Sequence, residues 1–234
     1  MNSDHESAGA RLLAGQDQII RRRDNALLRS ARAGRVDKDS LRRMVQADQL
    51  CLETETVAYA ILLARFPSGL AADLFAAVNT ALRSIKPSLD QCAQSLGSLP
   101  VSAADPAKTP DAFAFPLAVS WTCLHAGPAA AALALRSDFA AYARECRELL
   151  RTLTDAGAEV PEAFADHYGM PAPSELLDLA AAVVEDDVRE DDTSGHAASV
   201  AKVLLAGLDG FWRYAAGAER MPSAGTAGPH SRQE

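Results

Sequence analysis

Apolar side chains recur every three to four residues along most of the chain, which is the spacing of helices that bury one face. Proline and glycine interrupt this pattern and set the ends of the predicted segments. The pattern predicts helices over residues 10–33, 39–66, 68–96, 110–126, 129–154, 174–189 and 196–216, with a short helix or turn at 160–169. No alternating strand pattern longer than a few residues and no repeat of fixed period is present. We therefore expect an all-α bundle of about seven helices.

The composition fits a single helical domain. The chain has 234 residues, of which 48% are hydrophobic and 23% charged, so it can bury a sizeable core. Alanine is abundant and aromatic residues make up only 6%, which favours helices that pack through small side chains. We expect the bundle to span residues 10–218, with flexible tails at 1–9 and 219–234, because both ends are small, polar and rich in proline or glycine.

The net charge of −8 argues against nucleic acid or an anionic membrane as a partner. One segment, 21–43, is rich in arginine, and we interpret it as a solvated helix face. A helix-turn-helix regulator is the alternative for that segment, although no recognition-helix pattern is visible. The sequence contains neither a secretory signal pattern nor an apolar run long enough to span a membrane, so we expect a cytoplasmic protein.

The cysteines and histidines do not form a metal-binding pattern. Cys51, Cys92, Cys123 and Cys146 are widely scattered, and reduced, buried thiols are the expectation. No Glu-x-x-His pair, the motif of di-iron helical bundles, lies in the predicted helices. We expect no metal and no cofactor.

Two carboxylates interrupt an otherwise apolar stripe in the second predicted helix. Asp48 and Glu55 are seven residues apart and continue the face that carries Leu41, Val45 and Leu52. Buried carboxylates are uncommon unless they are paired or functional, and helical bundles hold ligand sites in their interior. The alternative is that one or both acids lie at the edge of the stripe, next to an arginine.

The order of several motifs resembles a known family. Residues 25–55, NALLRSARAGRVDKDSLRRMVQADQLCLETE, are similar to the opening of TenA-type proteins, the thiaminase II and PqqC type of the haem-oxygenase-like fold. The segments DAFAFPLAVSWTCLHAGPAAAALALRSDFAAYARECRELL, PEAFADHYGMPAPSEL and LLAGLDGFWRYA resemble the family's central helix pair, its linker and its closing helix. The resemblance covers about residues 10–216 and implies a central pocket for a small heterocyclic ligand in a homo-oligomer.

The resemblance also implies roles for particular residues. Asp48 matches the acceptor of the substrate amine, where a carboxylate makes charge-assisted hydrogen bonds. Thiaminase members carry a nucleophilic cysteine in the stretch that reads LRSDFAAY here, but this chain offers Ser137 and Asp138 instead. The glutamate of the closing motif is replaced by Leu208. Hydrolysis by a cysteine nucleophile is therefore not expected.

The candidate ligand site follows from these comparisons. Aromatic residues can stack on a heteroaromatic ligand, although simple core packing is the alternative for each of them. The candidate ligand-binding residues are Asp48, Cys51, Glu55, Trp121, Tyr142, Tyr168 and Phe211. Asp48 and Asp138 are the candidate catalytic residues, with Tyr168 as an orienting donor.

We therefore expect a protein that binds a small heteroaromatic or amine metabolite, similar to an aminopyrimidine. Two alternatives remain at this point. One is a non-catalytic binding or regulatory protein of a metabolic pathway, and the other is a metal-dependent oxidase of the same fold.

Overall fold

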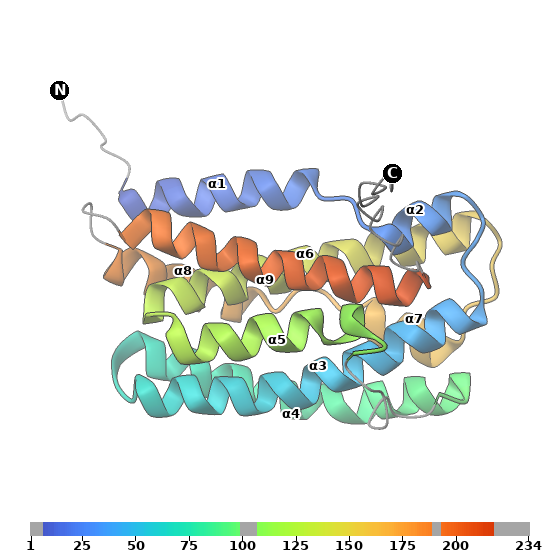
Figure 1. The fold of residues 1–234 in the computed structure, drawn as a ribbon, viewed down its shortest axis with the longest axis horizontal. Helices are drawn as coiled ribbons and strands as arrows, with labels where there is room; N and C mark the ends of the chain where they lie inside the picture. Colours follow the sequence, from blue (N-terminus) through green and yellow to red (C-terminus); the bar gives the residue numbers. More distant parts are fainter. Residues whose placement is uncertain (1–6, 99–106, 189–192, 218–234) are drawn as a thin grey trace, which may run out of the picture.

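The computed structural model describes residues 7–98, 107–188 and 193–217, and these residues form helices without strands (Figure 1). The helices are α1 (Ala8–Arg22), α2 (Ala26–Arg32), α3 (Lys38–Arg65), α4 (Gly69–Leu96), α5 (Pro110–His125), α6 (Pro128–Asp155), α7 (Glu162–Tyr168), α8 (Ser174–Asp187) and α9 (Thr193–Ala216). The prediction of an all-α bundle is confirmed. The finer prediction of a haem-oxygenase-like arrangement stays a prediction.

The long helices run side by side along the length of the molecule. In Figure 1, α9, α5 and α3 follow one another across the front, with α4 below them. Helix α5 packs against α9 on one side and α3 on the other, and α6 packs against α8 and α9. A core of apolar side chains from all of the helices fills the space between them.

Small residues let α9 and α5 approach closely. A Cβ atom added at Gly207 of α9 would lie 2.9 Å from the Cβ atom of Ala118 and 3.0 Å from the main chain of Phe115. Alanines 129–132 and 134 at the start of α6 are likewise buried. The high alanine content of the sequence therefore serves close helix packing, because small side chains reduce the distance between helix axes.

The first predicted helix, residues 10–33, is in fact two helices. The break falls at Arg23, whose backbone is extended (φ −66°, ψ 142°), and α2 then begins with Asn25 as its cap. The Asn25 side chain accepts a hydrogen bond of 2.8 Å from the backbone N–H of Leu28. Periodicity alone missed this break because the apolar spacing continues across it, whereas a capping asparagine favours a helix start.

The other predicted helix boundaries agree with the structure to within three residues. Helix α1 begins at Ala8, capped by the Ser7 side chain, so the predicted N-terminal tail 1–9 is too long by the residues of this first turn. The remainder of that tail, and the predicted tail 219–234, lie outside the described residues. Within the part of the chain that the structure describes, no helix is both long and apolar enough to cross a membrane.

Candidate functional site

A cavity of about 440 Å³ lies inside the bundle, in the size range of small-molecule sites. Helices α3, α4 and α6 form most of its wall, and α5, α7, α8, α9 and the segment between α7 and α8 complete it. Its polar and aromatic lining residues are Asp48, Cys51, Glu55, Ser84, Phe115, Asp138, Phe139, Tyr142, Cys146, His167, Tyr168 and Phe211.

The structure brings together every candidate site residue except one. Trp121 lies outside the cavity, on the outer side of α5, where 42% of its surface is exposed and its ring lies 5.2 Å from that of His125. The prediction that Trp121 lines the ligand site is therefore wrong in position. The reason is helical geometry: Phe115 and Val119 lie on the buried side of α5, and Trp121 projects from the opposite side.

Asp48 is the cavity carboxylate that makes polar contacts with other lining side chains. The Tyr142 hydroxyl donates a hydrogen bond of 2.9 Å to Asp48 Oδ2. The Tyr142 ring is fixed in turn by Trp212, which stacks on it at 5.7 Å, and by the edge of Phe211 at 5.8 Å. Burial, followed by the charge of Asp48, raises the pKa of Tyr142 well above its ordinary value. Tyr142 is therefore a donor to Asp48 at neutral pH.

His167 faces Asp48 from α7 and is buried. Its Nε2 atom lies 3.6 Å from Asp48 Oδ2, and its Nδ1 atom lies 2.8 Å from the Ser88 hydroxyl. The Ser88 hydroxyl also lies 2.8 Å from the carbonyl oxygen of Ile85, so this hydroxyl group holds the imidazole ring against α4. The sequence analysis did not assign His167 to the site, although its position next to Tyr168 could have indicated it.

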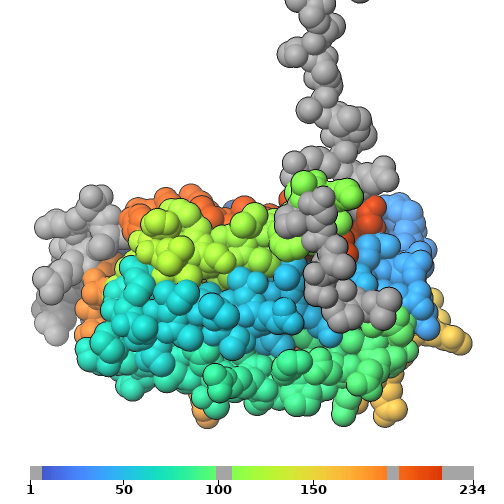
Figure 2. Space-filling view, turned by 60° about the horizontal axis from the view of Figure 1, so that its bottom comes forward, coloured from blue at the N-terminus to red at the C-terminus, as the bar shows by residue number. Residues whose placement is uncertain are grey.

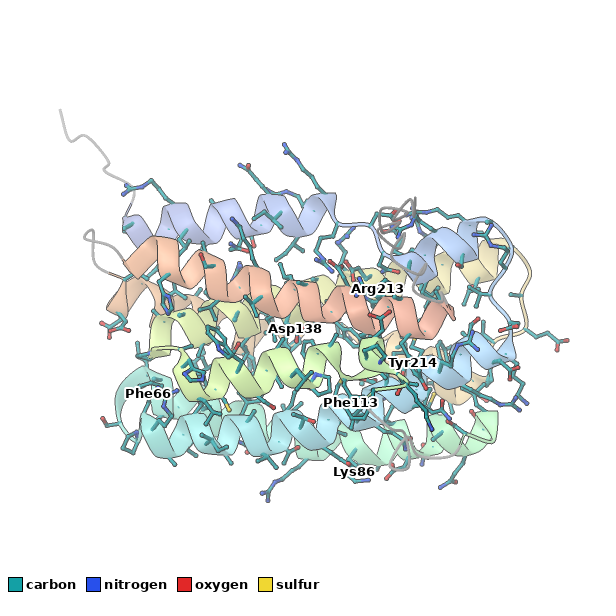
Figure 3. All side chains as sticks on the ribbon, viewed as in Figure 1. Phe66, Lys86, Phe113, Asp138, Arg213 and Tyr214 are labelled. Carbon is teal, nitrogen blue, oxygen red and sulfur yellow. The ribbon has the colours of Figure 1, made fainter. Side chains whose placement is uncertain are left out.

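Glu55 and Asp138 are two buried carboxyl groups on facing helices. Their exposed fractions are 8% and 4%, and within the described residues neither makes a hydrogen bond or an ion pair. Burial, followed by the charge of Asp138, raises the pKa of Glu55 well above its ordinary value. Burial also raises the pKa of Asp138 to about 8, against an opposing effect of Arg23. Figure 3 places Asp138 in the middle of the bundle.

Tyr168 adds a buried hydroxyl group that interacts with Asp48. This interaction falls short of a regular hydrogen-bond geometry, and the Tyr168 ring packs on Phe164 at 4.4 Å and against the edge of His167 at 4.6 Å. Burial, followed by the charge of Asp48, raises its pKa well above the ordinary value. A protonated hydroxyl group in this position can donate to a ligand.

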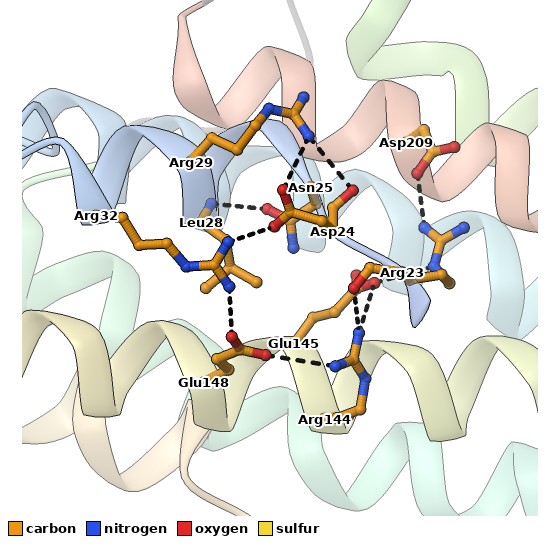
Figure 4. Close-up of polar contacts among 10 residues, drawn as sticks. All are labelled: Arg23, Asp24, Asn25, Leu28, Arg29, Arg32, Arg144, Glu145, Glu148 and Asp209. Atoms are coloured by element: carbon orange, nitrogen blue, oxygen red, sulfur yellow. Dashed lines mark hydrogen bonds and ion pairs between the residues drawn. The ribbon is translucent and has the colours of Figure 1, made fainter. Parts of the chain in front are cut away.

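Among the described residues, the cavity lining contains no lysine or arginine. The nearest buried cation is Arg23, at the corner between α1 and α2, where its guanidinium binds Glu145 Oε1 at 2.9 Å and Asp209 Oδ1 at 2.6 Å (Figure 4). Glu145 is fully buried, and sequence reasoning missed it. The available signal was its spacing of seven residues from Asp138, which puts both on one side of α6.

Several arginines of the arginine-rich segment are paired within the molecule, whereas Arg21, Arg22 and Arg35 are exposed at its surface. Besides Arg23, Arg32 binds both Asp24 and Glu148, and Arg42 binds Asp39 and the carbonyl oxygen of Leu96. The contacts of Arg23 and Arg32 tie the first two helices to α6 (Figure 4), and the contact of Arg42 with Leu96 ties α3 to α4. The interpretation of segment 21–43 as merely a solvated face is therefore incomplete.

The thiols of the cavity are poor nucleophiles. All four cysteines are free and buried. Burial, followed by the charge of Asp48, raises the pKa values of Cys51 and Cys146 well above the ordinary value. Leu208 lines the cavity, whereas the neighbouring Asp209 binds Arg23 instead. Neither a thiolate nor the acid of the closing motif is in place for cysteine-based hydrolysis.

No protein-family model matches this chain, and no curated protein is similar to it in sequence. The resemblance to TenA-type proteins therefore stays a prediction. No group of three or more His, Cys, Asp or Glu side chains in the described residues is arranged to hold a metal ion. The alternative of a metal-dependent oxidase gains no support from these residues.

Proposed function

We propose that this protein binds a small heteroaromatic amine, of the aminopyrimidine type, in the central cavity. The observation that carries the proposal is the pair Glu55 and Asp138, two carboxyl groups that are buried at the cavity and make no hydrogen bond to the residues that the structure describes. A buried polar group without a hydrogen-bond partner costs free energy. A ligand that forms hydrogen bonds with Glu55 and Asp138 would offset this cost.

The protonation of these groups points to the class of ligand. A pKa of about 8 keeps Asp138 mostly protonated at neutral pH, and burial raises the pKa of Glu55 as well. A neutral carboxylic acid donates through its O–H and accepts through its C=O. An aminopyrimidine presents the complementary pair, a ring nitrogen that accepts and an amino group that donates. Asp48 is a further acceptor for the amino group, and a cationic ligand would meet no lysine or arginine in the lining.

The remaining lining suits the flat ring of such a ligand. Phe115, Tyr142 and Phe211 present aromatic surfaces, and the Tyr168 hydroxyl supplies a donor. Asp138 is the group that would exchange a proton with the ligand, because its pKa of about 8 lies close to neutral pH. The proposal includes no step that needs a cysteine nucleophile.

Isothermal titration calorimetry with 4-aminopyrimidine tests the proposal, with unsubstituted pyrimidine as the matched ligand without an amino group. We expect the amine to bind and pyrimidine to bind at least tenfold more weakly. Asp48→Asn should weaken binding by about 1.5–3 kcal/mol because a charged hydrogen bond is lost, and Glu55→Ala and Asp138→Ala, which remove both the donor and the acceptor of a neutral carboxyl group, should each weaken binding by about 0.5–1.5 kcal/mol. Glu53→Gln is the matched control, because Glu53 is on the same helix but exposed.

Equal binding of both ligands, or equal affinity in the cavity variants and the control, would refute the proposal. Circular dichroism of each variant shows whether its helices are intact. This check separates loss of the site from loss of the fold.

A further inference from the structure

Most of the exposed large apolar side chains gather on one side of the bundle. Eight such side chains are exposed within the described residues, and five of them lie on three adjacent helices. They are Val57 of α3, Leu117, Trp121 and Leu124 of α5, and Val203 of α9. We call these five residues the α5 face. Figure 1 shows α9, α5 and α3 side by side on this front, and Figure 2 shows α5 in yellow-green directly beside α3 in blue.

The α5 face is continuous across the three helices. Leu117, Trp121 and Leu124 are spaced by four and three residues, so they form one stripe along α5. Leu124 and Val57 line a common groove between α5 and α3. Val203 is four residues before Gly207, which packs directly against Ala118 of α5, so it lies on the side of α9 that adjoins α5.

The exposure of this stripe is unusual for a surface helix. Leu117 is 66% exposed and Leu124 57% exposed, although the opposite side of α5 is already buried in the core. Between Asp111 and His125, helix α5 contains no charged residue. A helix that is apolar all round is normally covered on both sides, and contiguous apolar patches of this kind mark interaction sites.

We propose that the α5 face is the interface of a two-fold symmetric dimer of this chain. In a two-fold interface the same patch meets itself, so the patch must be self-complementary. An uncharged apolar centre meets this condition, because it buries no unpaired or like charge when it faces its own copy. The α5 face has no charge at its centre to pair with a charged partner, so a second copy of this chain is the occupant that it favours.

The charges at the rim of the α5 face fit the same arrangement. Exposed Glu53 borders it on α3, and exposed Lys202 borders it on α9, on the other side of α5. A two-fold axis that runs along α5 places α3 of one copy opposite α9 of the other. The acidic rim of each copy then faces the basic rim of its partner, and this selects the orientation of the dimer.

Light scattering coupled to size-exclusion chromatography, and sedimentation equilibrium, test this interface. We expect the wild-type protein to be a dimer and Leu117→Glu to be a monomer, or to dissociate at least tenfold more readily. Ile19→Glu is the matched control, because Ile19 is a large exposed apolar residue on α1, outside the α5 face, and this variant should remain a dimer. Thermal unfolding of Leu117→Glu, which removes no core side chain, verifies that the fold is retained.

Reversal of the rim charges tests the orientation. Glu53→Lys should weaken the dimer because it faces Lys202 of the partner copy, and the double variant Glu53→Lys/Lys202→Glu should restore it. A monomeric wild-type protein at high concentration would overturn the proposal and leave the α5 face for a different partner. A dimer that persists in Leu117→Glu would overturn it as well, because the interface would then lie elsewhere.

Discussion

The clearest physical consequence of the cavity is a pH-dependent stability set by Asp138. Its pKa is raised from an ordinary 3.8 to about 8, mainly by burial, so the folded state binds the proton more tightly than the unfolded state. The buried Asp138 carboxyl group therefore destabilises the fold least below pH 4. The free energy of unfolding falls as the pH rises from about 4 to about 8. Each pH unit in this interval costs about 1.4 kcal/mol. Between pH 5 and pH 7 the loss is about 3 kcal/mol.

The variant Asp138→Asn isolates this effect, because an amide of similar shape does not ionise. We expect the free energy of unfolding of the variant, relative to wild type, to rise by about 3 kcal/mol between pH 5 and pH 7. Urea denaturation followed by far-ultraviolet circular dichroism at pH 5, 6, 7 and 8 measures the difference. Asp155→Asn, an exposed acid at the end of the same helix, should follow the wild-type curve in parallel. A difference between Asp138→Asn and wild type that is constant across this range would refute the reasoning.

Two further predictions concern packing and charge. Arg23→Met should destabilise the fold by about 3 kcal/mol because it removes the closer of two arginines from the buried Glu145 carboxylate and leaves Arg144 at 3.8 Å, and Arg23→Met/Glu145→Gln should recover most of the loss in urea denaturation. Gly207→Ala should lower the free energy of unfolding by about 1–3 kcal/mol because its Cβ would press on Ala118. Gly15→Ala meets nothing within 4 Å and should instead be neutral or stabilising by about 0.5–1 kcal/mol, so equal effects of the two alanines would contradict the packing argument.

Much of the candidate site was predictable because helices make side-chain direction periodic. Asp48 and Glu55 were assigned to the inner face of one helix from their spacing alone, and both line the cavity. Asp138 and Tyr168 were assigned from the resemblance to a family and Tyr142 from its aromatic ring, and they line the same cavity. That these residues bind a ligand stays a prediction, which the calorimetry above tests.

Other residues escaped prediction for identifiable reasons. Trp121 was assigned to the site because it is aromatic, but the direction of a side chain on an apolar helix such as α5 cannot be read from its pattern, which has no polar side to mark the surface. The pairing of Arg23 with Glu145 and Asp209 joins residues more than a hundred positions apart. Sequence spacing carries information on neighbours within one helix and none on such distant partners.

The sequence by itself determined the helices, most of their ends and the face that each amphipathic helix buries, because these depend on local periodicity, capping and the backbone limits of proline and glycine. Only the tertiary structure decided which buried faces meet. The contact of Tyr142 with Asp48, the approach of His167, and the lack of a hydrogen bond to Glu55 and Asp138 from the described residues follow from the packing of α3, α6 and α7 around one cavity. Burial is a property of the assembled helices, and burial is what raises the pKa values on which the proposed chemistry depends.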